Sequence, residues 1–120
     1  MVERAQVSLF LDQMRACATC NFRLERRTKN METLAQLGMT IKDAKSRILR
    51  LTLNDYVSGP TPRSENSSQE AWVFQLEIDG VVIYVKVSIR LEPARCLCVS
   101  FHEAERPMMR PYAQEAKGER

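Results

Sequence analysis

The stretch CLCVSFHEAE, residues 96–105, holds the only histidine of the chain, His102. An imidazole has an unperturbed pKa of about 6.5, so it donates or accepts a proton near neutral pH. Three roles suit such a residue: acid–base catalyst, metal ligand, or surface histidine without a chemical task. The side chains that the fold brings beside His102 decide among them.

A predicted hairpin covers residues 72–89. Its two arms alternate with period two, and an Asp-Gly pair between them is a strong signal for a two-residue turn. With this turn, Gln75 lies opposite Tyr84 and Val73 lies opposite Lys86. One face of the hairpin is apolar, and the other carries the polar side chains.

A third predicted strand contains CLCVSFH and follows a turn around residues 92–94. We expect Arg90 to pair with Cys96, which sets Tyr84 opposite His102 and Lys86 opposite Ser100. In this register the polar face of the three strands collects Tyr84, Lys86, Cys96, Cys98, Ser100 and His102.

Histidine, lysine, tyrosine and an amide together supply what RNA cleavage without metal requires. A base removes the 2′-hydroxyl proton, the oxygen attacks the adjacent phosphorus, a cation stabilises the added negative charge, and an acid protonates the leaving 5′-oxygen. We expect His102 to be the general acid or base and Lys86 to stabilise the phosphorane. Tyr84 would share proton transfer or orient the phosphate, and Gln75 would position the substrate.

A basic cluster in FRLERRTKN adds to this interpretation. The net charge of the chain is only +3, but Arg23, Arg26, Arg27 and Lys29 crowd into this segment, and Arg90 follows the polar strand face. We expect these five residues to bind RNA, because neutralising phosphates releases counterions. Two alternatives stay open: a solvated surface, and a non-catalytic RNA- or protein-binding module that uses the polar sheet face.

The four cysteines form two close pairs, Cys17 with Cys20 and Cys96 with Cys98. A four-thiolate zinc site is one interpretation, but the second pair leaves a single intervening residue where zinc sites usually leave two to four. We favour buried thiols, and we expect neither a metal nor another cofactor. No apolar run approaches the roughly 20 residues that span a bilayer, so we expect a cytoplasmic protein without membrane contact.

The 120 residues fit one domain with a change of period in the middle. Residues 1–59 read as helices, in which Ser8, Asn30 and Thr40 are expected N-caps and Gly38 ends the second helix. Residues 60–70 are polar and predict a flexible loop, residues 71–103 predict antiparallel strands, and residues 104–120 form a tail. The predicted fold class is α+β, with N-terminal helices packed on one face of a small antiparallel sheet.

Three stretches resemble the MqsR-like toxins of bacterial type II toxin–antitoxin systems: METLAQLGMTIKDAKSRILRLTLNDYVSGP, AWVFQLEIDGVVIYVKV and CVSFHEAERP. The resemblance implies a messenger-RNA endonuclease with a RelE-like fold. By this resemblance, Tyr84 corresponds to the tyrosine of the family's active face and Lys86 to the lysine beside that tyrosine. Gln75 corresponds approximately to the family's glutamine. His102 stands where the family has lysine, and the lysine at the end of the helical part is absent from DYVSGP.

The same resemblance implies partners. Besides messenger RNA, it implies a cognate antitoxin with a zinc-binding domain that contacts the toxin and a helix-turn-helix domain. Any zinc then belongs to the antitoxin.

Overall fold

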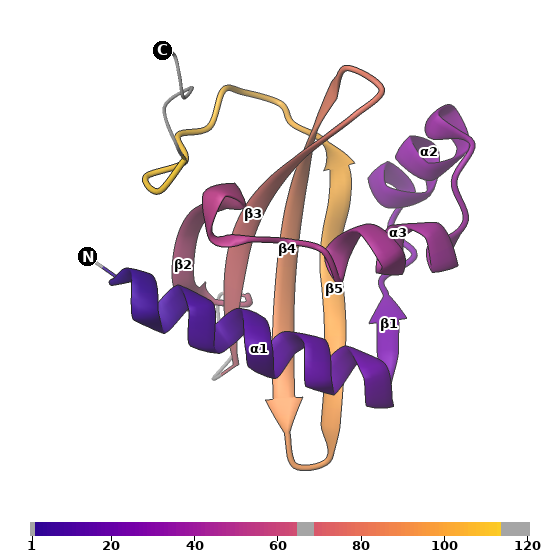
Figure 1. Cartoon of the computed structure of the whole chain (residues 1–120). Coiled ribbons are helices and arrows are strands. Elements are labelled where there is room, and N and C mark those ends of the chain that lie inside the picture. Colours follow the sequence, from indigo (N-terminus) through magenta and orange to yellow (C-terminus); the bar gives the residue numbers. More distant parts are fainter. Residues whose placement is uncertain (1, 65–68, 114–120) are drawn as a thin grey trace.

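The computed structural model describes residues 2–64 and 69–113, which fold as three helices against a five-stranded sheet (Figure 1). The helices are α1 (Arg4–Cys20), α2 (Thr28–Leu37) and α3 (Ile41–Ile48), and a short 3-10 turn, η1, covers Leu53–Asp55. The strands are β1 (Phe22–Leu24), β2 (Tyr56–Pro62), β3 (Glu70–Ile78), β4 (Val81–Leu91) and β5 (Ala94–Glu103). Among the described helices, none is both long and apolar enough to cross a membrane.

The predicted α+β class is confirmed. The sheet order is β1-β5-β4-β3-β2, with β1 parallel to β5 and the other neighbours antiparallel. Helix α1 crosses one face of the sheet (Figure 1) and buries an apolar stripe against it. The buried residues of that stripe are Val7, Phe10, Leu11, Met14, Cys17 and Ala18.

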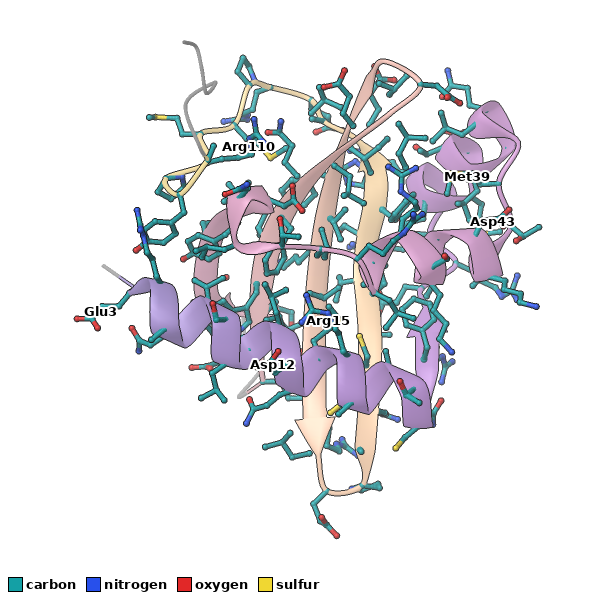
Figure 2. All side chains as sticks on the ribbon, viewed as in Figure 1. Glu3, Asp12, Arg15, Met39, Asp43 and Arg110 are labelled. Carbon is teal, nitrogen blue, oxygen red and sulfur yellow. The ribbon has the colours of Figure 1, made fainter. Side chains whose placement is uncertain are left out.

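Arg15 fastens α1 to the segment that follows α3, as Figure 2 shows near its centre. Its guanidinium donates to the backbone carbonyls of Leu49, at 3.0 Å, and Leu51. These bonds satisfy two carbonyls beyond the end of α3 that lack a helical partner. The connection from α3 to β2 therefore stays on the same face of the sheet as α1 (Figure 1).

The helix boundaries correct two of the expected N-caps. Helix α1 begins at Arg4 behind a capping box of Glu3 and Gln6, so Ser8 lies inside the helix. Helix α2 begins at Thr28, and Asn30 is a fully buried residue within it. The Thr40 capping box is confirmed, as is the left-handed Gly38 that ends α2 with φ 67°.

Residues 56–62 form strand β2, which corrects the predicted end of the helical part at 59 and the predicted loop over 60–70. β2 pairs with β3 in an irregular register, with Tyr56 opposite Phe74 and Thr61 opposite Ala71. Irregularities are common on edge strands, and they explain why the segment YVSGPTP shows no alternation. Part of the predicted loop, residues 65–68, and part of the predicted tail, residues 114–120, lie outside the described residues.

The register of β4 against β5 contains a β-bulge. Lys86 lies opposite Ser100 and Tyr84 opposite His102, as predicted, but Val87 lies opposite Cys98, so Val99 is left without a direct partner. Beyond the bulge the predicted pairing is wrong by one residue, because Arg90 pairs with Arg95 and not with Cys96.

The bulge also reverses the face of the two cysteines. Cys96 and Cys98 were expected beside Tyr84, but both are fully buried in the core under α1. We call the opposite face of the sheet, turned away from the viewer in Figure 1, the open face. It carries Tyr84, Lys86, Ser100 and His102.

Candidate functional site

His102 and Tyr84 lie face to face on the open face of the sheet. Their ring centroids are 5.3 Å apart with an interplanar angle of 24°. The two residues are direct partners in the β4–β5 ladder, which explains why the rings stack. The sequence prediction of this pair is therefore confirmed as a contact.

The imidazole of His102 is oriented by a backbone carbonyl. Its Nδ1 lies 3.0 Å from the carbonyl oxygen of Glu103. Because a carbonyl oxygen only accepts, Nδ1 carries the proton in this hydrogen bond. In the neutral ring, Nε2 is then the nitrogen with a free lone pair, which a base needs.

Tyr84 stays protonated to higher pH than an ordinary tyrosine. The residue is half-buried in the sheet, and desolvation raises the pKa of its phenol above the usual 10.0. A neutral phenol donates a hydrogen bond and carries a proton that it can transfer. Tyr84 is therefore a proton donor at neutral pH, and the neutral form of the His102 ring can accept a proton at Nε2.

The two rings open into a cavity of about 500 Å³, the histidine cavity. Its walls come from Val57 and Ser58 of β2, Val73 of β3, and the segment 104–108 that follows β5. This volume lies in the range of small-molecule and nucleotide sites. The contribution of β2 was missed from the sequence, because nothing in SGPTP indicates a strand.

Lys86 lies two residues from Tyr84 on the open face, and it is half-buried. Its ammonium donates to the backbone carbonyl of Arg63 at 3.3 Å. Gln75 lies directly opposite Tyr84 in the β3–β4 ladder, also as predicted. Neither Lys86 nor Gln75 lines the histidine cavity itself, so both stand beside it.

Asn30 of α2 holds the β-bulge in place. Its amide donates to the carbonyls of Glu25, at 2.9 Å, and Val99, at 3.1 Å, and its oxygen accepts from the Phe101 N–H at 2.9 Å. These bonds satisfy the backbone on both sides of Ser100, where a bulge leaves groups unpaired. Asn30 thus fixes the bulge at which β5 changes face, so that Ser100 and His102 lie on the open face while Cys96 and Cys98 lie in the core.

A second cavity, of about 720 Å³, lies along β1 and the start of α2. We call it the arginine cavity, because five arginines line it. Arg23, Arg26 and Arg27 were predicted from FRLERRTKN, whereas Arg63 and Arg95 were not. The fold brings these two from distant segments, so no local pattern in the sequence indicates them.

Two predicted RNA-binding residues lie apart from the arginine cavity. Arg90 is exposed opposite Arg95 and lines neither cavity. Lys29 lies at the wall of the histidine cavity, where its ammonium forms an ion pair with Glu105. This contact lowers the pKa of the Glu105 carboxyl, so the pair stays charged at neutral pH and Lys29 is partly neutralised.

The cysteines do not assemble as a metal site. Cys17, Cys96 and Cys98 are buried, Cys20 is exposed, and all four are free thiols. Within residues 2–64 and 69–113, no group of three or more His, Cys, Asp or Glu side chains is placed to hold a metal ion. The four-thiolate zinc interpretation is wrong, and buried thiols describe three of the four residues.

The fold and the open face define an α+β protein in which one sheet face is covered by a helix and the other carries a polar, basic site. Comparison with protein families shows to which family the chain belongs. Residues 7–103 match the family described as "Motility quorum-sensing regulator, toxin of MqsA", and the chain belongs to this family of toxins. The resemblance to MqsR-like toxins is thereby confirmed, and membership implies an antitoxin as partner. Neither the curated proteins nor the solved structures gave a match.

Proposed function

We propose that this toxin is a metal-independent endoribonuclease of the RelE-like kind that cleaves messenger RNA in the cytoplasm. The observation that carries the proposal is the stacked pair of Tyr84 and His102 at the wall of a 500 Å³ cavity. One ring has a free nitrogen lone pair, and the other holds a proton at neutral pH. A base and an acid in one cavity are the minimum that RNA cleavage requires.

The cleavage step follows from these roles. His102 Nε2 takes the proton of a 2′-hydroxyl, and the oxygen forms a new bond to the adjacent phosphorus. The bond from phosphorus to the 5′-oxygen breaks, and Tyr84 protonates that oxygen. The products are a 2′,3′-cyclic phosphate and a free 5′-hydroxyl. DNA is not a substrate, because it has no 2′-hydroxyl.

Lys86 and Gln75 support the reaction from beside the cavity. The Lys86 ammonium supplies positive charge beside the cavity, which stabilises the negative charge that the phosphorane gains in the transition state. Its bond to the Arg63 carbonyl holds it on the open face without cancelling that charge. Gln75, opposite Tyr84, orients the substrate through its amide.

The cognate antitoxin would neutralise this activity. We propose that it does so through a zinc-binding domain that contacts the toxin, and that a helix-turn-helix domain of the antitoxin binds DNA. The open face offers charge and two cavities for such a contact, whereas α1 covers the other face.

Induced expression in bacteria without the antitoxin tests the proposal. Wild type is expected to arrest growth and to leave discrete new ends in messenger RNA, mapped by primer extension. His102→Ala and Tyr84→Phe should lose both effects at equal protein level. Unaffected growth with intact RNA and soluble wild-type protein would contradict the proposal and favour a module that binds without cutting.

A further inference from the structure

The arginine cavity stands next to the proposed cleavage site without being part of it. Arg27 lines the cavity, and its Nη1 lies 3.4 Å from the Ser100 hydroxyl, opposite Lys86 in the ladder. Arg63 also lines the cavity, and its carbonyl accepts from Lys86. Two independent contacts, to Ser100 and to Lys86, therefore connect the arginine cavity to the residues beside the proposed cleavage site.

The charge of the cavity is strongly one-sided. Five arginines line it with a single acidic residue, Glu25, whose carboxylate oxygen lies 3.8 Å from Arg27 Nε. Arg23 and Arg26 are exposed, and Arg95 is half-buried. Among the ion pairs of the described residues, none joins Arg23, Arg26 or Arg95 to a carboxylate. Guanidinium groups bind phosphate through paired donors, so an anion with several phosphates suits this wall.

Apolar surface distinguishes the cavity from a plain anion site. Phe22, Ile41 and Leu97 line it between the arginines, and all three are only half-buried. Proteins stack the unpaired bases of single-stranded RNA on aromatic rings, such as that of Phe22, and on guanidinium planes. A volume of about 720 Å³ leaves room for a base together with its sugar and phosphate.

From this arrangement we infer that the arginine cavity is a second RNA subsite, which binds a nucleotide several positions away from the scissile phosphate on the same strand. The inference rests on the proposed nuclease function for the place of the scissile phosphate. Arg95 and His102 lie near opposite ends of β5, roughly 24 Å apart at about 3.4 Å per residue. A strand that occupies both cavities must therefore extend along the open face past Ser100.

Binding of single-stranded RNA to a protein that cannot cut it provides the test. In a His102→Ala background, the dissociation constants of a nine-nucleotide RNA and of a trinucleotide are measured by fluorescence anisotropy at several salt concentrations. The double variant Arg23→Gln/Arg95→Gln should weaken binding of the longer RNA at least tenfold. Its salt slope should become shallower by about 0.7 for each phosphate that the variant no longer neutralises. The affinity for the trinucleotide, too short to span both cavities, should change less.

Arg4→Gln is the matched control, because Arg4 lies on α1 over the Tyr112 ring and away from both cavities. If the longer RNA bound equally well to the control and to the double variant, or bound to neither protein, the subsite would be wrong. The inference would also be overturned if poly-L-glutamate bound as tightly as the longer RNA and lost its binding in the same double variant. In that case the cavity would bind an acidic protein segment.

Cleavage kinetics separate this inference from the proposed function. In the protein with His102 intact, Arg23→Gln/Arg95→Gln should raise KM several-fold and leave kcat nearly unchanged, because the interaction is the same in ground and transition states. Cleavage with an unchanged KM would contradict the subsite alone. Weakened binding in a protein that cuts no RNA would instead contradict the nuclease and leave the subsite standing.

Discussion

The chemistry proposed for this toxin depends on the environment of two side chains. Tyr84 lies in the sheet where burial keeps its phenol protonated, and His102 is oriented through Nδ1 so that Nε2 is free. Neither feature is visible in the residue types alone. Each comes from the position of the residue in the β4–β5 ladder.

The raised pKa of Tyr84 leads to a prediction on pH dependence. Tyr84→Phe should lower the rate of RNA cleavage about 10²–10⁴-fold, the usual contribution of a positioned acid. Because burial raises the pKa above 10.0, the phenol stays protonated throughout the neutral and mildly alkaline range. The ratio of wild-type to variant rates should therefore be constant from pH 7 to 9. A ratio that falls steadily across this range would show that the phenol ionises earlier and is not the acid.

The buried cysteines lead to a second prediction at this scale. Burial raises the pKa of the Cys96 thiol to about 12 and that of Cys98 well above 9.0. In native protein at pH 8, an alkylating reagent should modify Cys20 alone, and Cys20→Ser should abolish labelling. The unfolded chain ionises these thiols from about pH 9, so the free energy of unfolding should fall as pH rises from 9 towards 12. Rapid labelling of all four thiols at pH 8 would contradict the buried positions.

At the residue scale, the position of some side chains could be predicted from the sequence and that of others could not. The pairing of Tyr84 with His102 was predictable, because a two-residue turn and alternation fix the register of a hairpin. The position of Cys96 and Cys98 was not, because a single bulge at Val99 shifts the register and reverses the face. No residue type in CLCVSFH marks that bulge, and the side chain that holds it comes from another element.

That element is α2, which stabilises β5 through Asn30. Asn30→Ala should lower the free energy of unfolding by about 2–4 kcal/mol, because it removes three hydrogen bonds, two of them buried, and leaves their backbone partners unpaired. Cleavage by the folded variant should also decrease at temperatures well below its melting point, since Asn30 holds the N–H of Phe101, the residue next to His102. Asn21→Ala is the control, because the Asn21 side chain is exposed. Equal stability of the two variants in urea titrations would show that Asn30 does not hold the β-bulge in place.

Strand β2 is the element that the sequence analysis missed, and Gly59 shows how it is accommodated. Gly59 has φ +113°, and a Cβ there would lie 2.8 Å from the Ala71 carbonyl oxygen and 2.9 Å from the Trp72 Cα. The strand therefore approaches β3 so closely that only glycine fits. Proline and glycine in SGPTP suggested a loop, although here they form an irregular edge strand.

Gly59→Ala should destabilise the protein by about 2–4 kcal/mol through backbone strain and the clash with β3. The KM for RNA should also rise, because β2 supplies Val57 and Ser58 to the histidine cavity. Gly80→Asn is the control: Gly80 has φ +81° in the β3–β4 turn, has open space around it, and asparagine tolerates such turns. Thermal melting of both variants checks the difference, and equal melting temperatures would contradict the close approach.

At the scale of the whole molecule, the two faces of the sheet differ in role. One face packs against α1 and forms the core, and the open face gathers the stacked pair, Lys86 and the arginine cavity. The α+β class and the division into helices and then strands were readable from the change of hydrophobic period. The five-stranded order was not, because the parallel contact of β1 with β5 and the edge position of β2 depend on packing between distant segments.

Incubation of purified protein with a long messenger RNA in EDTA tests the central claim most directly, with the ends of the fragments identified chemically. The account predicts discrete fragments with 2′,3′-cyclic phosphates and 5′-hydroxyls, no cleavage of DNA of the same sequence, and loss of cleavage in His102→Ala. Intact RNA, or cleavage that persists in His102→Ala or that requires added divalent metal, would contradict it.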